Sequence, residues 1–175
     1  MTNKKLLKKI LVYFVLWRTA LFLIAAVSGK LIAYDPTFPY SSELAKSNLP
    51  QWLFSWANFD GVHYLTIADK GYVGTGLIQA FFPVYPLLIR AVSLVVASPI
   101  VAGMLISNLA FIGLMYFGYK LVKLDFSHKV ANLFLLILLV FPSSFYFGAV
   151  YTESLFLMSL LASLLYIRSS KKPIS

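Results

Sequence analysis

Long apolar runs, separated by short polar stretches, follow one another along most of this chain. The runs cover about 10–32, 100–119, 130–149 and 154–167. A helix needs about 20 predominantly apolar residues to cross the hydrocarbon core of a bilayer. The pattern therefore predicts an all-α fold, a polytopic membrane helix bundle with about four transmembrane helices.

The first run also has features of a signal peptide. Four lysines precede it, and the stretch Ala26-Val27-Ser28 resembles a cleavage site. Against this interpretation, the run is long, holds Trp17-Arg18 in its middle and precedes further apolar runs. We interpret 10–32 as the first transmembrane helix, with the N-terminus in the cytoplasm.

The segment 34–98 has a different composition and is predicted to form an extracytoplasmic loop. Its part 34–80 holds four of the six acidic residues, several prolines and glycines, and many aromatic residues. Tryptophan and tyrosine favour the headgroup level of a membrane, so we expect interfacial helices here, best placed at Leu49–Lys70.

The last part of the loop, 81–97, is apolar and allows two topologies. At 1.5 Å per residue it reaches about 25 Å, less than the ~30 Å hydrocarbon core. It also contains Arg90 and two prolines, Pro83 and Pro86. Either the segment crosses the bilayer and produces five spans, or it forms a re-entrant helix and leaves four.

The distribution of positive charge favours four spans. Five spans would place two basic clusters outside the cell, against the positive-inside rule, whereas four spans keep them inside. The basic residues that four spans place in the cytoplasm are Lys4, Lys5, Lys8, Lys9, Lys120, Lys123, Lys129, Arg168, Lys171 and Lys172. Because these residues occupy topological positions rather than one patch, the net charge of +9 does not indicate nucleic-acid binding.

The overall composition agrees with a membrane protein. The 175 residues are 60% hydrophobic and 12% charged, which disfavours an ordinary soluble domain and excludes a disordered chain. The absence of cysteine excludes a disulfide framework, a cysteine-based zinc site and a thiol nucleophile.

Asp60 and Glu153 are the candidate catalytic acids, and four spans place both on the outer side. A carboxylate at the water boundary beside apolar surface, as expected for Asp60, suits a general base. A solvated loop acid or a helix cap is the alternative for Asp60. Glu153 opens the last predicted helix, so an interaction with the helix dipole, with Thr152 as the N-cap, explains it as readily.

His63, Arg18 and Arg90 are further candidates for a binding site. On a helix, His63 would share a face with Asp60, and the two side chains could supply two ligands to a metal ion. A histidine that is hydrogen-bonded to backbone or water is the more common case. Arginines are costly in a bilayer and tend to face a cavity, a carboxylate or a phosphate. Snorkelling to the interface is the alternative, and it suits Arg90 better than Arg18. Pro142 is expected to bend the third run.

Three blocks together resemble a known family. They are 59–72 (FDGVHYLTIADKGY), 81–90 (FFPVYPLLIR) and 141–156 (FPSSFYFGAVYTESLF), and SNLAF at 107–111 also fits. In order and spacing they resemble the N-terminal half of PIG-V-type mannosyltransferases, which belong to the C-type superfold of integral membrane glycosyltransferases. Phe59 stands where family members often have tryptophan.

The resemblance implies transfer of a hexose from a polyprenyl or dolichyl phosphate sugar to an acceptor hydroxyl of a glycan or glycolipid. It also implies that Asp60 acts at the acceptor hydroxyl and that Glu153 lies on the same face. The residues expected to bind sugar or lipid phosphate are Arg90, Arg18, Trp56, Tyr64, His63 and Tyr85. No nucleotide is implied, no cofactor is certain, and a divalent cation stays open.

Two non-enzymatic alternatives remain at this point. One is a non-catalytic polytopic protein, such as a transporter fragment, a scaffold or a lipid-binding subunit. The other is an inactive, truncated glycosyltransferase, since enzymes of this superfold continue for several more spans. A transporter is expected to place ionisable groups at mid-membrane, whereas only Arg18 does so here. In each case we expect a multi-pass protein of a prokaryotic cell membrane.

Overall fold

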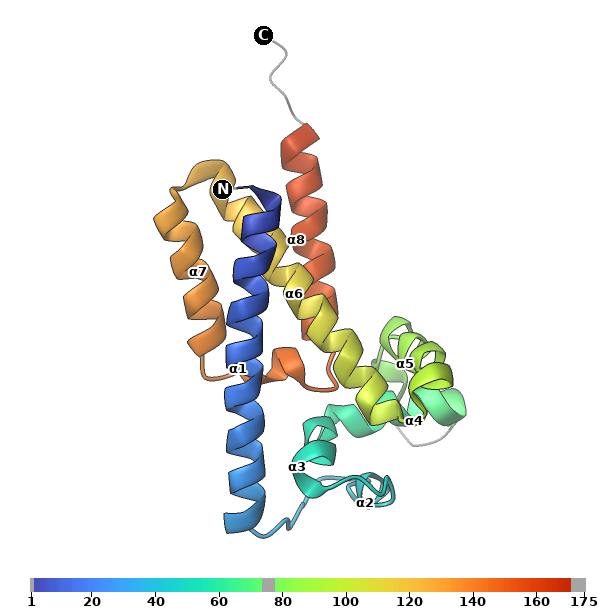
Figure 1. Cartoon of the computed structure of the whole chain (residues 1–175). Coiled ribbons are helices and arrows are strands. Elements are labelled where there is room, and N and C mark those ends of the chain that lie inside the picture. The colour runs from blue at the N-terminus through green and yellow to red at the C-terminus, as the bar shows by residue number, and fades with distance from the viewer. Residues whose placement is uncertain (1, 74–77, 171–175) are drawn as a thin grey trace.

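The computed structural model describes residues 2–73 and 78–170, and in this part of the chain all regular secondary structure is helical, without strands (Figure 1), which confirms the all-α prediction. The α-helices are α1 (Asn3–Leu31), α2 (Ser42–Ala45), α3 (Gln51–Phe54), α4 (Asp60–Lys70), α5 (Val84–Val96), α6 (Pro99–Asp125), α7 (His128–Val140) and α8 (Glu153–Ser170). The 3-10 helices are η1 (Ser55–Ala57), η2 (Gly71–Val73), η3 (Ile78–Ala80) and η4 (Ser144–Gly148).

The long helices α1, α6, α7 and α8 form one part of the molecule, and the short helices gather beside the beginning of α6 (Figure 1). The beginning of α1 and the end of α8 lie at the same end of this bundle. Helix α8 packs along α6, and α5 and α4 pack against each other and against the first turns of α6. The predicted loop is therefore a helical layer attached to one end of the bundle.

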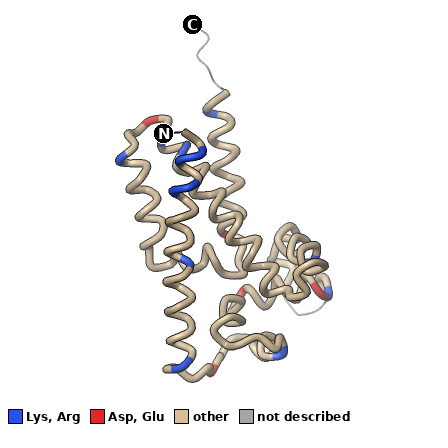
Figure 2. Tube along the Cα trace, viewed as in Figure 1, with Lys and Arg blue, Asp and Glu red and all other residues tan. Residues whose placement is uncertain are grey.

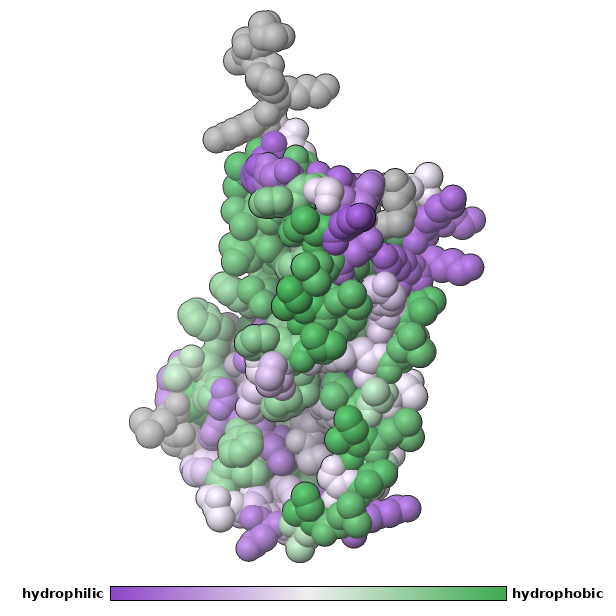
Figure 3. Space-filling view, turned by 90° about the vertical axis from the view of Figure 1, so that its left-hand side faces the viewer, coloured by the Kyte–Doolittle hydropathy of each residue, from purple (hydrophilic) through white to green (hydrophobic). Residues whose placement is uncertain are grey.

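Two helices, α1 and α6, are long and apolar enough to cross a membrane. Their 29 and 27 residues correspond to about 43 Å and 40 Å of helix. Helices α5 and α7 are apolar but shorter, with 13 residues each. Figure 3 shows apolar side chains covering the middle of one face, with hydrophilic side chains concentrated toward the end that carries the N-terminus.

Local sequence explains where the long helices begin. The Ser98 hydroxyl accepts a hydrogen bond from the Val101 N–H (3.4 Å), and Pro99 occupies the first turn of α6, where its missing N–H costs nothing. The Ser127 hydroxyl caps α7 in the same way through the Val130 N–H. A serine N-cap thus marks the start of both helices.

The third apolar run does not form the continuous helix predicted for 130–149. Helix α7 ends at Val140, and Phe141 is extended, with φ −60° and ψ 134°. The reason is Pro142, which disfavours helical backbone at the preceding residue and lacks an N–H of its own. The Ser144 hydroxyl then donates to the Leu139 carbonyl (2.9 Å), and the chain continues as η4.

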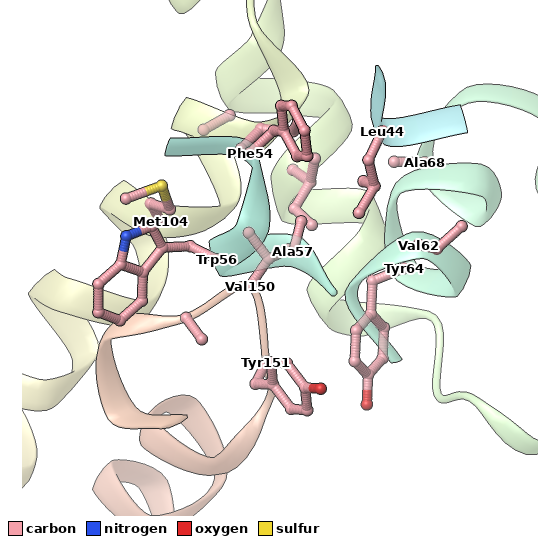
Figure 4. Packing of buried hydrophobic residues seen from close by; sticks show 14 of the residues in the cluster. Leu44, Phe54, Trp56, Ala57, Val62, Tyr64, Ala68, Met104, Val150 and Tyr151 are labelled. Carbon is pink, nitrogen blue, oxygen red and sulfur yellow. The ribbon is translucent and has the colours of Figure 1, made fainter. Parts of the chain in front are cut away.

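The buried residues form two clusters. The first joins α4, α5, the first half of α6 and residues 149–151 (Figure 4), and it includes Trp56, Tyr85 and Val150. The second joins α1, the second half of α6 and α7, and it includes Ile10 and Phe111. Helix α6 contributes to both clusters, so it is the common support of the two parts.

Arg18, in the middle of α1, connects these parts. Its Nη2 donates to the Gly148 carbonyl (2.9 Å), and its guanidinium carbon lies 4.2 Å from the Phe22 ring centroid and 4.1 Å from that of Trp56. The side chain is only 6% exposed. Such cation–π contacts offset part of the cost of removing the charge from water. The neighbouring Trp17 indole N–H donates to the Ser144 hydroxyl (3.3 Å), so η4 is held to α1 at two points.

Charge is distributed unevenly between the two ends of the bundle (Figure 2). Lysines and arginines gather where α1 begins and α8 ends, and Asp125 there forms an ion pair with Arg168 (2.7 Å). The other acidic residues lie in the helical layer or at the start of α8. The two ends therefore differ in electrostatic character.

The close contact between Arg18 and η4 predicts that Gly148 cannot accept a side chain. A Cβ at Gly148 would overlap the Arg18 guanidinium, so we expect Gly148→Ala to lower the free energy of unfolding by about 1–3 kcal/mol. Gly29→Ala is the matched control, because its Cβ would meet only ordinary contacts at 3.8 Å and alanine favours the helix interior. Circular dichroism during an SDS titration in detergent measures both variants, and equal stability of the two would contradict this account of Arg18.

Candidate active site at the meeting point of α4 and α8

The turn before Asp60 has an unusual backbone conformation. Phe59 adopts φ 58° and ψ −119°, a region that a residue with a side chain rarely occupies. Such strain persists only where the surroundings enforce it, and it is common at functional sites. The next residues begin α4, so Asp60 lies in its first turn and is exposed.

Hydrogen bonds join this turn to the segment before α8. The Val150 N–H donates to the Trp56 carbonyl (2.9 Å), and the Tyr151 hydroxyl donates to the Asn58 carbonyl (2.9 Å). Gly61 completes the contact, because a Cβ there would lie 3.3 Å from the Val150 carbonyl oxygen. Segments almost 100 positions apart in the sequence therefore meet, as the 93-residue separation of Tyr151 and Asn58 shows.

A third contact links the helices themselves. The hydroxyls of Tyr64 on α4 and Thr152, just before α8, lie 3.2 Å apart at hydrogen-bond distance. In Figure 4 the Tyr64 hydroxyl points away from the labelled aliphatic side chains, and the Tyr151 hydroxyl points toward the side on which Tyr64 is drawn. The N-terminal ends of α4 and α8, which begin with Asp60 and Glu153, are thus held together by two tyrosines.

The two acids influence each other electrostatically. Partial desolvation by the surrounding protein raises the pKa of the Glu153 carboxyl, its own backbone N–H lowers it in part, and the charge of Asp60 raises it further. Burial also raises the pKa of the Tyr64 and Tyr151 hydroxyls, and both acids add to this effect. The tyrosines are therefore neutral hydrogen-bond donors, and a proton is held more easily at Glu153 than at an ordinary glutamate.

A hollow of about 320 Å³ opens beside this group of residues. Phe81, Val84 and Tyr85 line one side of it, Leu155 and Phe156 the other, and the Tyr64 and Thr152 pair lies at its polar part. The volume lies within the range of small-molecule sites. The hollow can therefore accept an apolar group whose polar end approaches Thr152.

Asp60, Glu153 and Tyr64 are predicted site residues that the structure brings together, but Arg18 and Trp56 have other positions. Trp56 is 8% exposed, and its ring packs against both Arg18 and Phe22, so it offers no open face to a sugar. Arg18 is buried against Gly148. Arg18 and Trp56 are buried together because the guanidinium of Arg18 stacks on the Trp56 ring in the apolar surroundings of α1.

Arg90 and Tyr85 belong to α5, but their functional groups face elsewhere. Arg90 is exposed, and within the described residues no ion pair joins it to an acid. The Tyr85 hydroxyl is buried and bonded to the Gly103 carbonyl (3.0 Å) and to Ser107 (2.7 Å). Only the ring of Tyr85 contributes to the hollow beside Thr152.

His63 lies on α4 one turn after Asp60. Its ring stacks on Phe81, with centroids 5.0 Å apart, and meets the edge of Tyr40 at 5.7 Å. No group of three or more metal-binding side chains occurs in 2–73 and 78–170. The structure therefore gives His63 aromatic packing partners.

Sequence reasoning did not select Tyr151 and Asn58, although both are essential to this geometry. Tyr151 lies two positions before Glu153, and Asn58 two positions before Asp60. Their proximity to the acids was the available signal, but the bond between a tyrosine hydroxyl and a backbone carbonyl leaves no pattern in a sequence.

Comparison of the chain with protein-family models, curated proteins and solved structures finds no match in any of the three. Function is therefore inferred from the residues and their arrangement.

The electrostatic coupling between the two acids is directly testable. The chain has two glutamates, Glu43 and Glu153, so carboxyl-labelled ¹³C-glutamate produces two titrating NMR signals. We expect Glu153 to titrate above the ordinary range and Glu43 below it, because Lys46 lies 2.6 Å from Glu43 and lowers its pKa. Asp60→Asn removes a negative charge and should move the Glu153 midpoint downward while Glu43 stays unchanged.

Asp69→Asn is the control for this titration, since Asp69 does not contribute to the Glu153 shift. An Asp60→Asn variant with an unchanged Glu153 midpoint would show that the two carboxyls are independent.

Proposed function

We propose that this protein is an integral membrane glycosyltransferase that transfers a hexose from a polyprenyl phosphate sugar to an acceptor hydroxyl. The observation that carries the proposal is that Asp60 and Glu153, which begin α4 and α8, are close enough for the charge of Asp60 to raise the pKa of Glu153. Hydrogen bonds made by Tyr64, Tyr151 and Thr152 hold these two helix ends together. The resemblance to PIG-V-type mannosyltransferases covers the same residues.

The proposed reaction is a single displacement. The Asp60 carboxylate accepts the proton of the acceptor hydroxyl while the acceptor oxygen attacks the anomeric carbon of the donor. The bond from that carbon to the phosphate oxygen breaks, and the lipid phosphate leaves with the electron pair. Attack from the face opposite the leaving group inverts the anomeric configuration. Glu153, whose pKa is raised, can hold a proton close to the departing phosphate.

The hollow lined by Tyr85 and Phe156 fits the lipid end of such a donor. Its walls are largely apolar, and it reaches the Tyr64 and Thr152 hydroxyls, which can donate hydrogen bonds to a phosphate. In this arrangement the prenyl chain lies against α5 and α8 and the sugar points toward Asp60. Arg90 on α5 is the candidate cation closest in sequence to Tyr85, but it does not line the hollow.

The proposed topology has four crossings and a re-entrant α5, with the basic end in the cytoplasm. Helices α1 and α6 are long enough to cross, and the 18 residues of α8 reach about 27 Å. Helix α7 reaches only about 20 Å, so η4 completes the third crossing. Irregular backbone at membrane depth must be covered by protein, and Trp17 and Arg18 cover η4.

The decisive experiment is a transfer assay on the purified full chain with radiolabelled polyprenyl phosphate hexose. We expect Asp60→Asn to reduce transfer at least about 100-fold, because a general base contributes that much or more. Asp69→Asn, which alters an exposed acid at the other end of α4, should retain transfer.

The same assay tests the donor. A sugar nucleotide should not replace the lipid-linked sugar, and turnover with the nucleotide alone would refute the donor assignment. Full activity of Asp60→Asn would remove Asp60 from the mechanism. Absence of transfer with every polyprenyl phosphate hexose, by protein that retains its helical circular dichroism, would favour a non-catalytic membrane protein.

The topology predicts which positions react with a membrane-impermeant thiol reagent. The natural chain has no cysteine, so single variants at Lys70, Thr152 and Lys129 each introduce one thiol. In intact cells we expect labelling at positions 70 and 152, and labelling at 129 only after permeabilisation. Position 152 labelled only after permeabilisation would exclude the four-crossing topology.

A further inference from the structure

A second hollow, of about 420 Å³, lies beside the Asp60 turn. It is bounded by the end of α1, by the loop that follows α1, and by α3 and η1. It shares no lining residue with the hollow beside Thr152. Asn58 and Phe59 form part of its wall, so the hollow lies immediately next to Asp60 in the chain.

The lining combines aromatic rings with polar side chains, one of which is a carboxylate, and it also includes the apolar residues Ala25, Ile32, Ala33 and Pro36. The aromatic residues are Tyr34, Phe38, Trp52 and Phe59, and the polar side chains include Asp35, Thr37, Gln51 and Asn58. Phe59 is 58% exposed, so its ring is available to a ligand. A hydrocarbon ligand would leave the amides and hydroxyls without partners, whereas a polyol would satisfy them.

The walls of this hollow are held in place by their own contacts. The Tyr34 hydroxyl donates to the Asn58 side-chain oxygen (3.0 Å), and the Tyr34 ring meets the edge of Phe54 at 5.1 Å. The Phe38 and Phe59 rings lie 4.8 Å apart. Aromatic pairs of this kind favour one arrangement, so the site requires little ordering when a ligand binds.

Charge restricts the class of ligand further. Asp35 is the only ionisable carboxylate in the lining, and none of the residues that line the hollow is lysine, arginine or histidine. A phosphate or another anion would meet a negative charge there without a cation to balance it. The lining therefore disfavours an anionic ligand, and its uncharged amides and hydroxyls match a neutral polyol.

We propose that this hollow binds a neutral carbohydrate, with the C–H face of a sugar ring on Trp52 or Phe59 and its hydroxyls on Asp35 and Gln51. This assignment rests on the proposed function, for which it names the acceptor as a neutral glycan that approaches Asp60 from the α1 side. The lipid-linked donor, which is anionic, occupies the hollow beside Thr152.

The test uses ¹⁹F NMR of the full chain labelled with 5-fluorotryptophan, in phosphatidylcholine nanodiscs free of glycoside detergents. The three tryptophans are Trp17, Trp52 and Trp56, and single phenylalanine substitutions assign their signals. The probes are the neutral methyl glycosides of mannose, glucose and galactose, with glycerol and inorganic phosphate for comparison. We expect at least one glycoside to shift the Trp52 signal saturably while the signal of Trp17, which does not line this hollow, stays in place.

Variants distinguish a built site from general solvent effects. Asp35→Asn should weaken glycoside binding about tenfold, because a charge-assisted hydrogen bond to a sugar hydroxyl is lost. Gln51→Ala is the second variant should Asp35→Asn not fold, and Asp69→Asn is the matched control that should bind as the natural chain does. No saturable Trp52 shift with any glycoside, an equal shift with glycerol, or the same affinity in Asp35→Asn and Gln51→Ala would overturn the proposal.

This binding assay contains no donor, so its outcome is separate from that of the transfer assay. Saturable binding without transfer would retain the carbohydrate site and refute the transferase. Transfer without a Trp52 response would retain the transferase and refute the carbohydrate site.

Discussion

The buried guanidinium of Arg18 is the contact on which the arrangement of this protein depends. It stacks on Trp56, four residues before Asp60, and donates to the carbonyl of Gly148, five residues before Glu153. A charge held away from water is costly unless such partners compensate it, so helix α1, the Asp60 turn and η4 are constrained to meet at one place. The backbone hydrogen bond from the Val150 N–H to the Trp56 carbonyl joins the same two segments closer to the two acids.

That joint explains why the two acids share one environment. Asp60 and Glu153 both begin helices, and each is stabilised by the positive end of its helix dipole. Because Tyr64, Tyr151 and Thr152 hold these helix ends together, the repulsion between the carboxylates is built into the fold. A carboxyl whose pKa is raised by burial and by a nearby acid, as at Glu153, is typical of sites that carry out acid–base chemistry. The two hollows near this turn differ in chemistry: one is largely apolar, and the other has more aromatic rings and polar side chains in its lining.

Sequence reasoning succeeded where a local physical rule applied and failed where burial decided. Apolar length predicted helices close to α1, α6 and α8, and the aromatic, acidic composition of 34–80 predicted short helices between them. Pro142 was recognised as an interruption, yet its effect is larger than a bend, because the α-helix ends at Val140. Trp56 was expected to contact a sugar, but a tryptophan at an interface and one packed on a buried arginine have the same sequence signature. Trp52 and Phe59, which line the polar hollow, illustrate the same limitation.

The sequence by itself determined the all-helical class and the concentration of lysines and arginines toward the start of α1 and the end of α8. These follow from helix length, composition and charge, which act over a few neighbouring residues. Only the tertiary structure decided that Tyr151 contacts Asn58, that Arg18 faces Gly148, and that two different hollows lie near one turn. Contacts of this kind join residues roughly a hundred positions apart. They form because the folded chain must pack its side chains closely and at the same time provide hydrogen-bond partners for its buried polar groups.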